Sequence, residues 1–118
     1  MIGIYVNNAH CFADLIINGS KVYETRNRNT LKKFIGTRVA IVKTGNHKKP
    51  VVIGFVNIMG VLQSDWIVYR RMAYIYGTEY DCKQGEHKYF YRLESPVKIT
   101  PFPLPSNTIR HGRIFCDF

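Results

Sequence analysis

The sequence has no long apolar run and no apolar leader of the kind that directs secretion. A transmembrane helix needs about 20 consecutive apolar residues, and no stretch of the 118 residues approaches that length. Residues 1–8, MIGIYVNN, lack the basic start and the apolar run of a signal peptide. We therefore expect a cytoplasmic protein that does not associate with membranes.

Cysteine is scarce, and its spacing offers no pairing. The three cysteines, Cys11, Cys82 and Cys116, are far apart and none belongs to a CxxC motif. A disulfide framework or a cysteine zinc site needs paired, closer spacing. The four histidines lack metal-ligand spacing, and no HExxH, GxSxG or P-loop motif is present. These absences predict reduced thiols, no metal and no cofactor.

Acidic residues are few, and this imbalance points to the class of partner. The chain has 8 Asp and Glu residues against 17 Lys and Arg, a formal charge of +9 with a pI near 9.7. Such an excess favours polyanions, and nucleic acid first among them. An anionic membrane surface is the weaker alternative, because no segment combines a broad apolar face with a basic one.

The length and the apolar content favour one domain spanning residues 1–118. Hydrophobic residues make up 46% of the chain and charged residues 21%, an ordinary globular balance. Runs rich in β-branched and aromatic residues predict the strands. These strands are expected at Ile2 to Val6, Val22 to Arg26, Arg38 to Lys43, Val51 to Val61, Lys88 to Leu93 and Arg113 to Cys116.

Helices are fewer than strands in the predicted fold. Apolar periodicity with glycine stops predicts one helix over about Ala9 to Asn18, a short one capped by Thr30 and ending at Gly36, and a third over Trp66 to Tyr76. The proline cluster PFPLP at 101–105 should form an extended crossing segment. We expect an α+β fold, a small mixed β-barrel closed by the terminal strands with two or three peripheral helices.

Charged residues of both signs gather where the first expected helix meets a strand. After Gly19 come Lys21, Glu24 and Arg26 in the segment INGSKVYETR. Strand alternation places Glu24 and Arg26 on one face, where they can pair. A structural interpretation is an ion pair at the rim of a sheet, with Lys21 as a solvated cation at the helix end. The functional interpretation is a site facing a ligand.

The spacing of these residues resembles a known family. The pattern Gly-x-Lys-x-x-Glu-x-Arg after an amphipathic helix is similar to the signature of the ASCH family within the PUA-like superfamily. The segment LKKFIGTRVAIVKTG, and the C-terminal YFYRLESPVKITPFPLP followed by RHGRIF, resemble later parts of the same family. The resemblance covers nearly the whole chain except about 65–85. It implies a barrel of the PUA-like type.

The resemblance implies two kinds of activity, RNA binding and catalysis. Some ASCH proteins are small amidohydrolases that remove the acyl group of acetylcytidine, and ribonuclease activity is attributed to a few. The family's lysine falls on Lys21, but Glu24 stands where the amidohydrolases carry threonine, and Thr25 should point to the opposite strand face. A carboxylate facing a lysine holds it protonated rather than freeing it as a base. Lys21 and Glu24 are thus the catalytic candidates only if the chain is an enzyme.

The binding interpretation makes fewer chemical demands, and we adopt it as the prediction. Lys21 and Arg26 would bind phosphate or the polar edge of a base, while Glu24 orients Arg26 and accepts from an exocyclic amine. The basic loop KTGNHKK and the C-terminal arginines would contact the phosphate backbone of the nucleic acid. Alternatively, the loop merely keeps an edge of the sheet soluble. The candidates from these segments are Lys43, Lys48, Lys49, Arg110 and Arg113. The predicted partner is RNA or a modified nucleotide; the remaining alternative is a basic protein-interaction module without a nucleic-acid ligand.

The aromatic strand leaves two roles open. In YFY, Tyr89 and Tyr91 share one strand face and Phe90 takes the other. Such a face either packs into the core or stays wet, where aromatic rings stack on unpaired bases.

Overall fold

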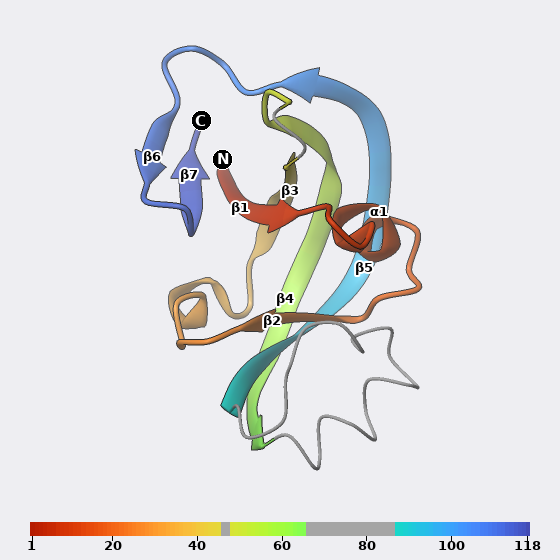
Figure 1. Ribbon diagram of the computed structural model, residues 1–118, viewed down its shortest axis with the longest axis vertical. Helices are drawn as coiled ribbons and strands as arrows, with labels where there is room; N and C mark the ends of the chain where they lie inside the picture. The colour runs from red at the N-terminus through yellow and green to blue at the C-terminus, as the bar shows by residue number, and fades with distance from the viewer. Residues whose placement is uncertain (46–47, 66–86) are drawn as a thin grey trace.

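Alternating apolar residues fold the chain into seven strands of one mixed sheet (Figure 1). The computed structural model describes residues 1–45, 48–65 and 87–118. The strands are β1 Ile2–Asn7, β2 Tyr23–Arg26, β3 Arg38–Thr44, β4 Val51–Asp65, β5 His87–Pro103, β6 Ile109–His111 and β7 Phe115–Asp117. Their order is β2-β5-β4-β3-β1-β7-β6. β1 pairs with β3 in parallel, and the other pairings are antiparallel.

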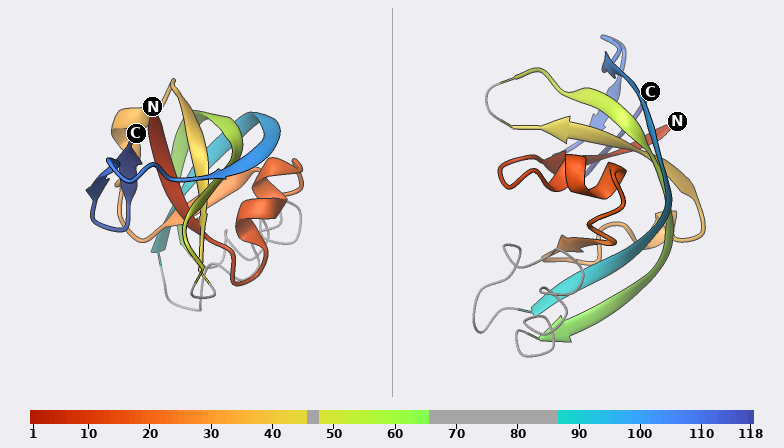
Figure 2. Two further views of the ribbon diagram at one scale, coloured as in Figure 1. Left: turned by 90° about the horizontal axis from the view of Figure 1, so that it is seen from above. Right: turned by 90° about the vertical axis from the view of Figure 1, so that its right-hand side faces the viewer.

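The sheet is strongly curved along its two longest strands. β4 and β5 pair over 15 and 17 residues, and their register shifts at three places. Such irregularities bend a strand and increase its twist. At Gly54 the backbones come so close that a Cβ would lie 2.3 Å from the carbonyl oxygen of Val97. The curve leaves a concave side on which the helix lies (Figure 2).

The α-helix of the described residues, α1 Phe12–Ile17, begins three residues later than expected. The segment before it is a turn, in which the Ala9 N–H donates to Oδ1 of Asn7 at 2.8 Å. Cys11 has a φ of 59°, in the left-handed region, so a helix cannot run through it. The buried face of α1 carries Ala13, Ile16 and Ile17. No helix in the described residues is long and apolar enough to span a membrane.

The second expected helix is a single 3-10 turn, η1 Lys32–Phe34. Thr30 does not cap it: no side-chain cap bond is present, and the Thr30 hydroxyl is buried without a partner in the described parts of the chain. Gly36 follows with a φ of 85°, as expected for a helix stop. The third helix, predicted at 66–76, lies outside the described residues.

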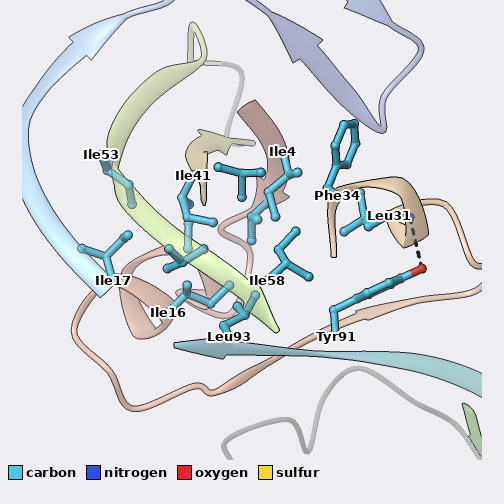
Figure 3. Close-up of a cluster of buried hydrophobic side chains, with 14 residues drawn as sticks. Ile4, Ile16, Ile17, Leu31, Phe34, Ile41, Ile53, Ile58, Tyr91 and Leu93 are labelled. Atoms are coloured by element: carbon cyan, nitrogen blue, oxygen red, sulfur yellow. Dashed lines mark hydrogen bonds between the residues drawn. The ribbon is translucent and has the colours of Figure 1, made fainter. Parts of the chain in front are cut away.

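The core fills the concave side of the sheet and includes Tyr91 (Figure 3). Tyr91 is 0% exposed. Its hydroxyl donates to Oδ1 of Asn29 at 2.6 Å and accepts from the Leu31 N–H at 3.1 Å. Tyr89 is half-buried against the same cluster. The face shared by the two tyrosines therefore packs in the core, and Tyr91 has no ring face available to a base.

The expected α+β, mostly-strand architecture is confirmed, but closure of the barrel is not. The terminal strands β1 and β7 pair as expected, from Ile2 opposite Asp117 to Ile4 opposite Phe115. Within the described residues the ladder nevertheless ends at β2 and β6. β1 pairs with β3 on one side and, from Ile2 to Ile4, with β7 on the other, whereas β2 pairs with β5 and not with β1. The seam between β1 and β2 is where the candidate site lies.

Candidate functional site

Glu24 and Arg26 form the predicted pair on one face of β2. Nη2 of Arg26 lies 3.4 Å from Oε2 of Glu24. The other carboxylate oxygen, Oε1, accepts from the Thr25 N–H at 3.0 Å. Glu24 is only 5% exposed. A buried carboxylate needs such donors, so its position is set by its own strand.

Arg26 also connects β2 to β1 across the open seam. Its Nη2 donates to the carbonyl oxygen of Tyr5 at 2.7 Å. Since β1 and β2 are not neighbours in the ladder, this side chain takes the place of a strand pairing. The guanidinium fork suits the task because it carries five donors in a fixed geometry. Arg26 therefore has a structural role whether or not it contacts a ligand.

Lys21 is buried, so the expectation of a solvated cation at the helix end is wrong. It is 1% exposed, and its Nζ lies 4.8 Å from the centroid of the Phe12 ring. A cation over an aromatic face is stabilised by the ring quadrupole. Lys21 does not line the cleft described next, whereas Phe12 does. Its link to the cleft runs through this ring.

A cleft of about 600 Å³ opens at the seam. Its lining comes from β1, the start of α1, β2, the end of β3 and the loop that follows it, and from β6 and the turn that follows it. The lining residues are Tyr5, Val6, Asn7, Phe12, Glu24, Thr25, Arg26, Thr44, Pro50, Arg110, Gly112 and Arg113. The volume falls within the range of pockets that take small ligands, about 300 to 1,000 Å³. Segments from both halves of the chain therefore make one site.

The cleft is positively charged. Among the residues that the structure describes, Arg26, Arg110 and Arg113 line it together with a single carboxylate, that of Glu24. Arg110 and Arg113 are exposed and form no ion pair with another described residue. Burial raises the pKa of the Tyr5 hydroxyl above its ordinary value, and the charge of Arg110 opposes that rise. The charge of Arg110 thus acts on the pKa of Tyr5, a residue of the cleft lining.

Four of the eight predicted binding residues line the cleft: Glu24, Arg26, Arg110 and Arg113. Lys43 does not, because it pairs with Asp14 at 3.1 Å beside a second hollow of about 330 Å³. Lys48 and Lys49 are exposed and precede Pro50, which is in the lining.

Other lining residues were not among the predicted contacts. Phe12 falls within the helix expected over Ala9 to Asn18, and nothing in its spacing indicates a second role. Asn7 and Thr44 come from the ends of paired strands, and only the register of β1 against β3 brings them together. Thr25, expected to face away from Glu24, also lines the cleft. Across the three described ranges, no group of histidine, cysteine and carboxylate side chains is arranged to hold a metal ion.

The fold and the cleft together define a class of protein. A mostly-strand mixed sheet that curves around one helix, with a basic cleft at its seam, is compatible with a domain of the PUA-like type. No family model matches the chain, and none of the curated proteins is detectably similar to it.

Comparison with solved structures shows that ASCH proteins share this fold. A serine-to-alanine variant of the ASCH protein from Zymomonas mobilis is 25% identical, with a TM-score of 0.65 over 86% of this chain and 72% of that one. A tyrosine-to-phenylalanine variant is 23% identical, with a TM-score of 0.60 over 86% and 76%. The ASCH structure from the same organism without a stated substitution is 23% identical, with a TM-score of 0.59 over 86% and 73%. These matches support an ASCH domain in this chain, in agreement with the resemblance of its sequence motifs to that family.

Proposed function

We propose that this protein is an RNA-binding module that holds one nucleotide, plain or modified, in the cleft between β1, β2 and the β6–β7 turn. The observation that carries the proposal is the lining of the cleft, where three arginines face one buried carboxylate. A concave basic site of this size suits an anionic ligand with a polar ring. The net charge of +9 on the whole chain also favours an anionic ligand.

Glu24 and Phe12 supply the contacts for a base. Glu24 lines the cleft beside the Thr25 N–H and Arg26, and a carboxylate can accept several hydrogen bonds at once, so it can also accept one from a ligand. An exocyclic amine, as in cytosine or adenine, is the matching group. Phe12 lines the cleft with a half-buried ring, and stacking of a base on an aromatic ring contributes about 1 to 3 kcal/mol. A base with an amine edge is therefore the preferred occupant.

The affinity of a labelled single-stranded RNA tests the proposal. Binding to the full chain, measured by fluorescence anisotropy, should weaken as salt rises, with the logarithm of the affinity falling by about 0.7 per phosphate contact for each tenfold rise in salt. Absence of binding, or tight binding that salt does not change, would contradict it.

Glu24→Gln separates recognition from a purely structural role of the corner. Glutamine keeps the shape and the acceptor for the Thr25 N–H, but it loses the charge. We expect about tenfold weaker binding of RNA that contains cytosine and adenine. Lower stability with unchanged affinity would instead favour a module whose corner only stabilises the fold, so thermal unfolding is measured on the same samples.

The amidohydrolase alternative is tested on the same protein preparation. Glu24 occupies the position of the amidohydrolase threonine, so we expect no release of acetate from acetylcytidine. Turnover that is lost in Lys21→Ala and in Glu24→Ala would overturn the binding-only proposal and place catalysis at this corner. Turnover that both variants keep would place it elsewhere.

A further inference from the structure

The turn between β6 and β7 brings two arginines into the cleft from a part of the chain that the family signature does not include. Arg110 belongs to β6, and Arg113 follows Gly112 in the turn. Both are exposed, and neither pairs with a carboxylate of the described residues. Two guanidinium groups that share one cleft without a counter-charge favour the arrival of an anion.

The hairpin holds these arginines on a fixed support. Arg110 lies opposite Cys116 in the β6–β7 ladder, and Cys116 is fully buried. The ring of His111 stacks on Phe115, with centroids 4.3 Å apart and planes inclined by 10°. Gly112 has a φ of 59°, and a Cβ at this position would meet nothing within 4 Å. The turn is therefore tight and open on its outer side.

We infer that Arg110 and Arg113 bind the phosphate of a nucleotide whose base lies against Phe12 and Glu24, an inference that rests on the proposed function. The planar guanidinium matches two phosphate oxygens at once, which lysine does not. The carboxylate of the cleft belongs to Glu24, which is already engaged by Arg26 and the Thr25 N–H. The arginines of the hairpin thus have no competing anion in the described part of the cleft. The inferred ligand therefore carries a phosphate, and it is a nucleotide or an RNA segment rather than a free nucleoside.

Calorimetry on the full chain with cytidine and with cytidine monophosphate tests this inference. We expect the monophosphate to bind about tenfold to hundredfold more tightly, because charge-assisted hydrogen bonds to phosphate are added. The double variant Arg110→Ala, Arg113→Ala should lower the affinity for the monophosphate to that for cytidine and leave cytidine binding unchanged. Arg92→Ala is the matched control, since Arg92 is also exposed but does not line the cleft.

Two more ligands distinguish the sources of phosphate. A short single-stranded RNA without terminal phosphates should bind with a salt slope that falls by about 0.7 per lost contact in the double variant. Inorganic phosphate should bind much more weakly than cytidine monophosphate, because it lacks the base. Inorganic phosphate binding as tightly as the monophosphate would overturn the inference in favour of a free-phosphate site.

Failure of the inference differs from failure of the proposed function. Equal affinities for cytidine and its monophosphate, or a double variant no weaker than Arg92→Ala, would overturn the phosphate role while base binding stands. Absence of binding for every nucleotide and for RNA would overturn both. Both arginines are exposed, so circular dichroism and thermal unfolding should show that the double variant keeps the fold.

Discussion

At the scale of single residues, burial changes what a polar side chain does. Lys21 is 1% exposed, and its Nζ lies 4.8 Å from the centroid of the Phe12 ring instead of meeting solvent. Tyr91 is fully buried, and its hydroxyl satisfies both Asn29 and the backbone of Leu31. Each of these residues joins a loop or helix to the sheet. Their roles follow from the environment and not from the residue type alone.

Burial of Tyr91 makes stability depend on pH in a defined direction. Desolvation raises the pKa of Tyr91 above its ordinary value of 10.0, against the lowering effect of the Leu31 N–H. Above pH 10 the unfolded chain loses this proton before the native chain does, so the contribution of Tyr91 is complete below pH 10 and is lost as pH rises through the native pKa.

Tyr91→Phe removes the titrating hydroxyl, so its stability relative to the wild type should change with pH. Near pH 8 we expect the variant to be less stable by about 1 to 3 kcal/mol, because the buried Leu31 N–H loses its acceptor. The difference from the wild type should shrink at a pH above 10, as the pH passes through the raised pKa of Tyr91. Urea unfolding at both pH values measures it. Tyr5 also has a raised pKa and remains in both proteins, so a difference that does not change with pH would contradict the assignment to Tyr91.

At the scale of elements, the seam between β1 and β2 combines structure and site. The two strands do not pair in the ladder, and Arg26 reaches from one to the other. The same gap in the ladder exposes the walls of the cleft. An arginine that crosses an unpaired seam can stabilise the fold while it leaves space for a ligand.

Substitution of Arg26 should destabilise the protein by a graded amount. Arg26→Lys keeps the charge but lacks the fork, and we expect a loss of about 1 to 3 kcal/mol in the free energy of unfolding. Arg26→Ala also removes one charged partner of the buried Glu24 carboxylate, and the loss should approach about 3 to 5 kcal/mol. Urea unfolding measures both. Arg92→Lys, in the exposed pair with Glu94, should change little, and equal losses at the two sites would refute the seam role of Arg26.

A helix or strand could be predicted from the sequence where the residues that determine it lie within the same short segment. The alternation that predicts β1 to β4 lies within each segment, and the spacing of Glu24 and Arg26 in one strand was enough to predict their pairing. The late start of α1 depends on the side chain of Asn7, and the three-residue β6 is too short to show a period. β5 runs on from Leu93 to Pro103, so the first three residues of the expected proline crossing belong to the strand.

At the scale of the whole molecule, the cleft depends on pairings between distant segments. Arg110 reaches the cleft because β6 pairs with β7, and β7 pairs with β1. Phe12 reaches it through the position of α1 in the curve of the sheet (Figure 2). No local pattern of residues predicts these pairings between distant strands. The sequence therefore predicts the charged corner and names Arg110 and Arg113 as candidates, but only the structure shows that they share one cleft with that corner.

The net charge of +9 and the local site should act on different steps of binding. Charges around a cleft accelerate the approach of an anion, and contacts inside it slow its release. Lys48 and Lys49 are exposed directly before Pro50 in the lining. Lys48→Gln with Lys49→Gln should slow association with RNA severalfold, on the order of a factor of three, and leave dissociation nearly unchanged. The double variant of Arg110 and Arg113 should mainly speed dissociation.

Stopped-flow fluorescence with labelled single-stranded RNA separates the two rates. The matched control is Arg92→Gln with Lys98→Gln, which removes the same charge from exposed positions that do not line this cleft. If only the overall field of the molecule mattered, both pairs of substitutions would slow association equally. We expect a larger effect from Lys48 and Lys49, and an unchanged preference for cytidine monophosphate over cytidine. Equal effects of the two pairs would show that the loop lysines contribute net charge alone, so that only the arginines of the cleft contact the ligand.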